Sequence, residues 1–218
     1  MSEPFEVKDC ALITLATGLK AFTCREIAEA VARVDASSIY HHFWGGLLRP
    51  GLEDPEYQND FAAWAWHGLN DAVLAERLSI IDPTAFPDTE ELRQELIDVI
   101  EEHIDESETA KWKAANFEFH FINSQLVIFD TKVRLHEPED LRINAPLMSV
   151  GSIYYHLIDG RGRSYTGAND FSGWLLQFGE KYLALADKIA EIDPYFTTLV
   201  DLKADLVFIL DAYMDGVS

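Results

Sequence analysis

The chain has 218 residues, of which 48% are hydrophobic and 25% are charged, a composition typical of a globular protein. Its formal net charge of −21 argues against binding to nucleic acid or anionic lipid, because an acidic surface repels phosphate groups. The sequence has no signal-peptide pattern and no apolar run of about 18 residues, and Cys10 and Cys24 form no zinc-binding series. We therefore expect a soluble, cytoplasmic protein with two free thiols.

The first segment, residues 5–16, is rich in β-forming residues and predicts a strand. A helix is the alternative for this segment, because its alanine and leucine residues also have helical spacing. Thr23 and Glu26 then form the capping pattern of a helix whose apolar stripe runs to Val34. A second, short helix is expected to end at Trp44, before two glycines.

Two longer helices are predicted next. Asp60 has the character of an N-cap and opens a predicted helix that continues to about Ile81. A helix with a leucine stripe is expected over residues 89–104. The acidic, weakly apolar stretch that follows is interpreted as a linker over residues 106–116.

The second half of the chain repeats this order. Residues 117–129 alternate between apolar and polar types and predict a β-hairpin or a bulged strand, whose first residue, Phe117, matches Phe5. A long helix is predicted from Asp170 to Ile192, and a last helix carries another leucine stripe.

Two blocks of sequence identity support an internal duplication. Residues 38–49 and 152–163 are identical at six of twelve positions, and residues 59–64 and 169–174 at four of six. The predicted fold is therefore α+β and mostly helical, with two tandem copies of a strand-plus-helices unit packed as a pseudo-twofold pair. Copy one spans residues 1–105, the acidic linker 106–116 and copy two 117–218.

Four polar positions recur in both copies and form the candidate shared polar set. The set consists of His42, Arg49, Asn59, Asp60, His156, Arg163, Asn169 and Asp170. We interpret it first as a buried hydrogen-bond network, because residues needed for folding are needed in both copies, whereas a catalytic site is needed once. The alternative is that the two sets meet and form one site. No catalytic residue and no cofactor is assigned.

Two further features suggest chemistry more weakly. His41, His42, Asp60 and His67 offer ligand types that zinc or iron accepts, but the positions of His41 and His67 hold other residue types in copy two. The glycine- and arginine-rich stretch at residues 160–164 is a basic island that could hold an anion, and a solvated loop is the simpler interpretation.

Residues 11–43 resemble the helix-turn-helix of TetR-type repressors. The matching residues are Thr23, Arg25-Glu26-Ile27-Ala28 and Ile39-Tyr40-His41-His42-Phe43. The glycine expected in the turn is missing, and residues 37–40 of the would-be recognition helix offer no lysine or arginine to phosphates.

A fuller resemblance is to a family of bacterial and archaeal proteins of unknown function. The shared features are an aromatic strand, a helix with a leucine stripe, a histidine, the motif Asn-Asp-Phe-x-x-Trp and a Leu-Ala pair. In this chain they are Phe5, residues 27–34, His42, residues 59–64 and Leu74-Ala75, and in copy two Phe117, His156, residues 169–174 and Leu185-Ala186. The resemblance implies no activity, since the family has none assigned. Some relatives accompany glycosyltransferase-like modules, which implies that an accessory or sugar-related role is conceivable.

The leading functional prediction is a non-catalytic binding or regulatory accessory module built by internal duplication. Its expected partner is a protein or a small molecule, with sugar-related compounds among the candidates, and a homo-oligomer is an option. Nucleic acid, membrane and cofactors are not expected. The two alternatives are an enzyme with a His/Arg/Asp site shared between the copies and a TetR-like DNA-binding repressor.

Overall fold

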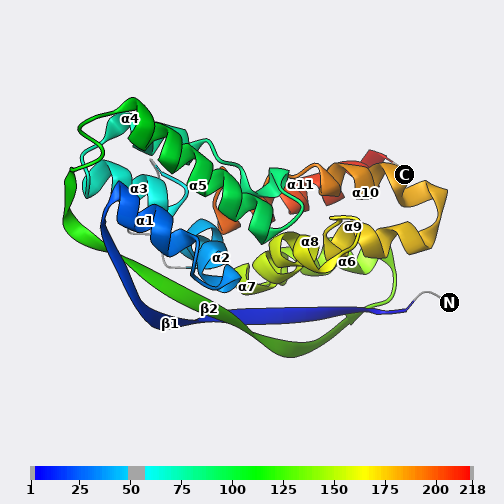
Figure 1. Cartoon of the computed structure of the whole chain (residues 1–218). Coiled ribbons are helices and arrows are strands. Elements are labelled where there is room, and N and C mark those ends of the chain that lie inside the picture. The colour runs from blue at the N-terminus through cyan, green and yellow to red at the C-terminus, as the bar shows by residue number, and fades with distance from the viewer. Residues whose placement is uncertain (1–2, 49–56, 217–218) are drawn as a thin grey trace. The chain divides into compact units, whose positions relative to one another are not determined.

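The computed structural model describes residues 3–48 and 57–216 of the chain (Figure 1). Its contacts divide the chain into two compact units: unit 1 comprises Met1–Ala11 and Leu126–Ser218, and unit 2 comprises Leu12–Gln125. The units therefore do not coincide with the repeat copies at residues 1–105 and 117–218. Each unit combines the helices of one predicted copy with segments of both strands.

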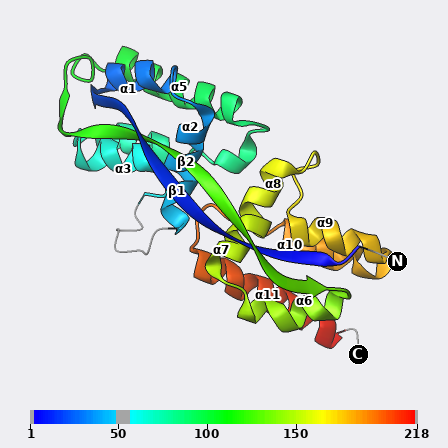
Figure 2. The same ribbon diagram turned by 90° about the horizontal axis from the view of Figure 1, so that it is seen from below.

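Two long strands pass through both units. β1 (Phe5–Thr23) and β2 (Ala114–Leu135) form a two-stranded sheet and run side by side in opposite directions (Figures 1 and 2). The strand interpretation of residues 5–16 is thus confirmed, and the strand continues to Thr23. The hairpin interpretation of residues 117–129 is wrong, because β2 is one continuous strand whose hydrogen-bond partner is β1.

Each strand bends at a residue with a positive φ angle, Gly18 (+78°) in β1 and Lys132 (+66°) in β2. The hydroxyl group of the preceding threonine bridges the strands at both bends. Thr17 donates to the Phe121 carbonyl over 2.7 Å, and Thr131 donates to the Val7 carbonyl over 2.5 Å. A local left-handed residue of this kind kinks a strand and increases its twist.

Unit 2 contains the helices of the first half of the chain. They are α1 (Cys24–Val31), α2 (Ala36–Trp44), α3 (Asp60–His67), α4 (Ala72–Ser79) and α5 (Thr89–Glu106). The Thr23 side chain caps α1 as predicted, by accepting the Glu26 amide N–H. Leu92, Leu96 and Ile100 form the buried stripe of α5, which packs on α1, α2 and α4.

The predicted long helix from Asp60 to Ile81 is wrong, because the segment forms two helices, α3 and α4. Asn70 between them has φ +52°, a value at which a right-handed helix cannot continue. Asp71 then caps α4 by accepting the Leu74 amide N–H over 3.2 Å.

The cap of α3 is also one residue earlier than predicted. Asn59 is the N-cap, and its Oδ1 accepts the Ala62 amide N–H over 2.9 Å, while Asp60 is the first helical residue. The Asp60 carboxylate is therefore free to bond to another side chain.

Unit 1 contains the helices of the second half. They are α6 (Pro138–Asn144), α7 (Val150–Ile153), α8 (Gly160–Arg163), α9 (Asp170–Leu175), α10 (Leu183–Ala190) and α11 (Leu199–Gly216). A wider, π-type turn over Tyr154–Asp159 joins α7 to α8.

The solvated loop predicted at residues 160–164 is wrong up to Arg163, because these residues form α8. The predicted long helix from Asp170 to Ile192 is likewise divided, with Gly179 at φ +85° between α9 and α10.

The helix-turn-helix resemblance does not extend to the fold. Residues 11–23, where that motif begins with a helix, belong to β1. Ser38 and Ile39 on α2 are 0% exposed, so the segment that would read DNA bases faces the interior of unit 2.

The α+β class with mostly helical content is confirmed. The residues predicted as a linker, 106–116, lie within unit 2, where Ala110 is buried and the Asn116 amide N–H donates to the Gly68 carbonyl.

Both thiols, Cys10 and Cys24, are free and buried. Within the described ranges, no helix combines the length and apolar character that crossing a bilayer requires.

Candidate functional site

In unit 2, the recurring polar residues join a strand to two helices. The Nδ1 atom of His42 on α2 lies 2.7 Å from Oδ2 of Asp60 at the start of α3. The Nε2 atom of the same ring accepts the backbone N–H of Ile122 in β2 over 3.1 Å. Beside this bond, the Phe119 ring stacks on Phe61 at 5.0 Å, and the Trp64 indole N–H also donates to the β2 backbone.

Unit 1 has the same arrangement, with its histidine 114 positions and its carboxylate 110 positions further along the chain. His156 Nδ1 lies 2.7 Å from Asp170 Oδ2, and His156 Nε2 accepts the backbone N–H of Lys8 in β1 over 2.9 Å. The Phe5 ring stacks on Phe171 at 5.3 Å, and the Trp174 indole N–H donates to the backbone before β1. We call these two groups the strand joints.

Both ring nitrogens of each histidine are engaged. A backbone N–H can only donate, so Nε2 must accept and the ring proton must reside on Nδ1, directed at the carboxylate. His42 and His156 are therefore neutral and held in one tautomer. An Asp–His pair can orient a catalytic imidazole, but here a strand amide occupies the position of a reacting group.

Burial supports the neutral form of His156, whose side chain is 3% exposed. Removal from water lowers the pKa of His156, and this effect outweighs the neighbouring Asp170 carboxylate, which favours the charged form. The strand joint of unit 1 thus keeps its hydrogen-bond acceptor at neutral pH.

The two asparagines of the candidate set also have structural bonds. Asn59 and Asn169 cap α3 and α9, and their amide nitrogens donate to the carbonyls of Leu78 and Ile189 over 3.0 and 3.2 Å. Both side chains are buried. Each asparagine thereby fixes one helix start against the end of the next helix in its unit.

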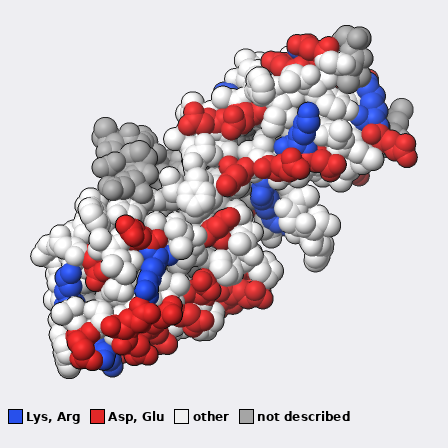
Figure 3. All heavy atoms as spheres, turned by 90° about the horizontal axis from the view of Figure 1, so that it is seen from above, with Lys and Arg blue, Asp and Glu red and all other residues white. Residues whose placement is uncertain are grey.

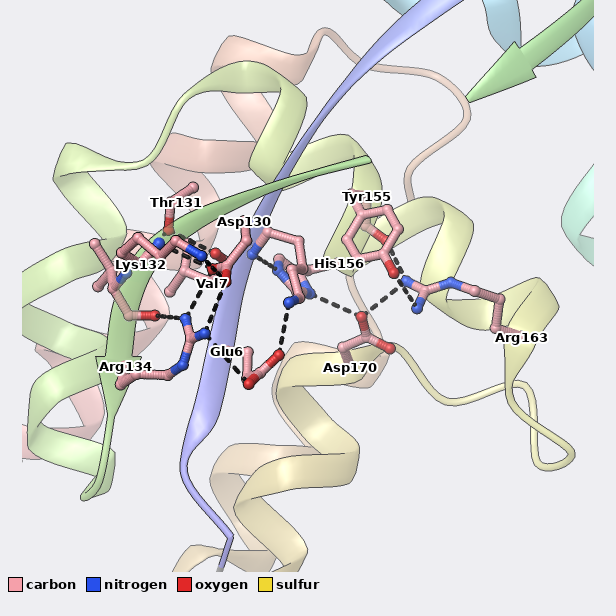
Figure 4. Close-up of polar contacts among 12 residues, drawn as sticks. Glu6, Val7, Asp130, Thr131, Lys132, Arg134, Tyr155, His156, Arg163 and Asp170 are labelled. Atoms are coloured by element: carbon pink, nitrogen blue, oxygen red, sulfur yellow. Dashed lines mark hydrogen bonds and ion pairs between the residues drawn. The ribbon is translucent and has the colours of Figure 1, made fainter. Parts of the chain in front are cut away.

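Arg163 extends the joint of unit 1 toward the surface (Figure 4). Its guanidinium group donates to Asp170, Asp159 and the Tyr155 hydroxyl over 2.8–2.9 Å, and it lies 3.9 Å from the centroid of the Tyr155 ring. In the joint of unit 2 the corresponding carboxylate is Asp60, and Arg49 of the candidate set lies outside the described residues.

A polar hollow of about 450 Å³ adjoins this arginine in unit 1. Its walls include the start of β1, Tyr155, Arg163 and the segment after α8 with Ser164 and Thr166. Gly160 lies close to the floor, where an added Cβ would be 2.9 Å from Asp170 Oδ1. The close approach of α8 to the joint therefore leaves no room for a side chain at Gly160.

Within the described part of the chain, the cluster that could hold a metal ion lies at the joint of unit 2. His41, His42 and Asp60 offer atoms that lie within 4.8 Å of one another, whereas His67 is exposed near the end of α3. A metal at this cluster would have to replace the bonds that His42 makes to Asp60 and to Ile122.

The sequence interpretation missed which strand residues complete the joints. Phe117 was matched with Phe5, but the ring that occupies the corresponding place in unit 2 is Phe119. Tyr155 was also overlooked as the partner of Arg163. The offset of 114 residues that relates the Ser-Ile-Tyr blocks also relates Phe5 to Phe119, and is the signal that could have identified the register.

Comparison with protein families agrees with the resemblance found in the sequence. The model of a family described as "Family of unknown function (DUF5752)" matches residues 2–211. The chain belongs to this family. Because that match spans both units, the two strand joints of this DUF5752 protein lie within the family region.

A solved structure shares the fold of this DUF5752 protein. OrfY from Thermoproteus tenax is similar with a TM-score of 0.84 and 28% sequence identity, over 99% of this chain and 98% of the OrfY chain. No curated protein matches the sequence significantly.

Proposed function

We propose that this DUF5752 protein is a non-catalytic binding or regulatory module, built by internal duplication, whose ligand site is the polar hollow beside Arg163. The observation that carries the proposal is the use of both ring nitrogens of His42 and His156 in strand joints. This use leaves the recurring histidines without a lone pair for proton transfer. The proposal places the module in the cytoplasm, which its two free thiols suit.

The duplication is supported by contacts as well as by sequence. In each unit, a histidine binds the first carboxylate of the following helix and a strand amide, and a phenylalanine three residues before that amide stacks on the same helix. The bends at Gly18 and Lys132 obey the same offset of 114 residues. Such agreement in both strand and helix supports two copies of one unit that have exchanged strands.

The hollow suits a neutral, polyhydroxylated small molecule. Its cations are already paired, since Lys8 Nζ lies 2.6 Å from Glu6 and Arg163 binds Asp159 and Asp170. An anion would gain little from paired cations, whereas hydroxyl groups can both donate to carboxylate oxygens and accept from an N–H. The hydroxyl groups of the wall add further partners for the same ligand type.

The proposal is tested by titrating the full chain with neutral sugars, sugar phosphates and inorganic phosphate, followed by calorimetry and NMR. Thr166→Trp is designed to fill the hollow from an exposed position, and Tyr165→Ala beside it is the matched control. We expect one neutral sugar to bind wild type and Tyr165→Ala alike and Thr166→Trp at least about tenfold more weakly, a difference of about 1.4 kcal/mol.

Two results would contradict the proposal. Equal binding to Thr166→Trp would place the ligand elsewhere, and chemical conversion of the bound sugar, followed by NMR over hours, would make the protein an enzyme. A ligand that carries phosphate and binds better than its neutral form would instead show that the paired cations are available to anions.

A further inference from the structure

A second hollow lies in unit 2, away from the strand joint. It has a volume of about 430 Å³ and lies between α5 and the turn that follows α4. Its apolar wall includes Ile80, Phe86 and Val99, while Glu95 and Glu102 of α5 lie at its edge. Ile80 is 76% exposed, an unusual degree for an isoleucine that lines a depression.

Arg77 provides a hydrogen-bond donor in this hollow. Its Nη2 donates to Glu106 over 2.6 Å, but its Nη1 is buried and, among the residues that the structure describes, has no hydrogen-bond partner. A buried N–H without an acceptor is unfavourable, so a ligand whose carbonyl oxygen reached Nη1 would gain a hydrogen bond there.

The corresponding turn of unit 1 supplies an aromatic ring of its own. The amide N–H of Thr84 donates to Asp82, and that of Tyr195 donates to Asp193, each over 2.8 Å, so the two turns share one geometry. Tyr195 is 1% exposed, whereas Thr84 is exposed. At this position of the turn, unit 2 thus has a small exposed residue and unit 1 has a buried ring.

The acidic side chains around the hollow indicate the charge of the partner that can bind there. The exposed surface of α5 is acidic and includes Glu91, Asp98, Glu101 and Asp105, and the one arginine of α5, Arg93, is paired with Glu90. Figure 3 shows acidic side chains gathered on the face that it presents, with far fewer basic ones. A basic partner is therefore favoured and an acidic one is repelled.

We propose that this hollow of unit 2 docks a basic peptide segment of a partner protein. A large apolar or aromatic side chain of the segment enters the hollow, a backbone carbonyl accepts from Arg77 Nη1, and flanking lysine or arginine residues lie against Glu95 and Glu102. A peptide supplies these three features together, and the segment fits the general pattern of one buried anchor within a charged rim. The inference concerns a partner surface and does not depend on the ligand proposed for unit 1.

The probe is a fluorescent peptide with the sequence Lys-Lys-Tyr-Lys-Lys, added to the full chain labelled at its isoleucine methyl groups. Anisotropy gives the affinity, and methyl NMR gives the location. We expect the methyl signals of Ile80 and Ile81 to shift. Ala85→Trp, which fills the hollow from an exposed position, should weaken binding at least about tenfold. Ala204→Trp, at an exposed position on α11, is the matched control and should bind as wild type does.

A second peptide separates docking from general attraction to an acidic surface. Replacement of the tyrosine by alanine should weaken binding about as much as Ala85→Trp does. Equal affinity for the two peptides, unchanged binding to Ala85→Trp, or no binding at about 1 mM peptide would each overturn the proposal. Loss of the Ile80 shift in Glu102→Lys, with folding verified by circular dichroism, would support the role of the rim.

Discussion

The two strand joints use the same residues for the same contacts, but their surroundings differ. In unit 2 the joint histidine His42 bonds to the Asp60 carboxylate, and the residue before it is His41, which is buried. In unit 1 the carboxylate of Asp170 also accepts from Arg163, which is stacked on Tyr155 beside a polar hollow. The shared part serves the fold in both units, and the residue before the joint histidine, His41 in unit 2 and Tyr155 in unit 1, is a described position at which the surroundings differ.

The largest effect should come from the aromatic residues that the strands contribute. Phe119→Ala and Phe5→Ala each remove a buried ring from a joint, and we expect the free energy of unfolding to fall by about 3–5 kcal/mol in each case. Denaturant titration measures this loss. Phe117→Ala, at a residue that is 48% exposed, is the control and should cost far less. A larger loss for Phe117→Ala than for Phe119→Ala would reject the register described above.

Removal of either histidine should have the next largest effect. His42→Ala and His156→Ala leave a strand N–H and a carboxylate without their partner, which typically costs about 1–3 kcal/mol. Hydrogen exchange adds a local test: His156→Ala should accelerate exchange at Lys8 and leave Ile122 protected, and His42→Ala should do the reverse. His67→Ala, at an exposed position, is the control. Acceleration at both amides in both variants would contradict two separate joints.

The stability of unit 1 should depend on pH through His156. Because burial lowers the pKa of His156 in the folded protein, its contribution is complete above the unfolded pKa of about 6.5. The contribution is lost as the pH falls below that value toward the folded pKa. Each pH unit between the unfolded and the folded pKa removes about 1.4 kcal/mol of stability. The difference in stability between wild type and His156→Ala should therefore shrink from pH 7.5 to pH 5. A difference that is constant or grows toward low pH would show that the ring is charged in the folded state.

The smallest effect on stability should come from Arg163. Its side chain is 40% exposed, so its ion pairs with Asp159 and Asp170 are screened by water, and Arg163→Gln should cost about 1 kcal/mol or less. Thermal unfolding of this variant beside His156→Ala measures the contrast. A loss as large as that of His156→Ala would mean that the arginine belongs to the structural part of the joint.

The sequence predicted which segments form helices and strands better than it predicted which of these elements contact one another. Local patterns indicated the strand from Phe5, the capped helix after Thr23 and the stripe of α5, because these depend on residues close in the chain. The break at Asn70 was missed, since an asparagine in the left-handed region is not distinguishable by periodicity from one inside a helix.

The joints themselves could be predicted only in part. Repetition identified His42, Asp60, His156 and Asp170 as one group, but it could not show which strand segment meets which helices. That choice depends on contacts between residues distant in sequence, such as Lys8 with His156. The hollow of unit 1 was not predictable either, because it arises where three separate segments converge.

The division of the chain between its two units also implies an order of folding during synthesis. Unit 2 consists of one continuous segment, Leu12–Gln125, and can fold as soon as that segment has left the ribosome. Unit 1 needs Met1–Ala11 together with Leu126–Ser218, so its strand segment is synthesised first and its helices last. Throughout that interval the apolar side chains of Phe5 and Val7 lack the helices of unit 1, and the nascent chain presents an open strand edge with which another chain can pair.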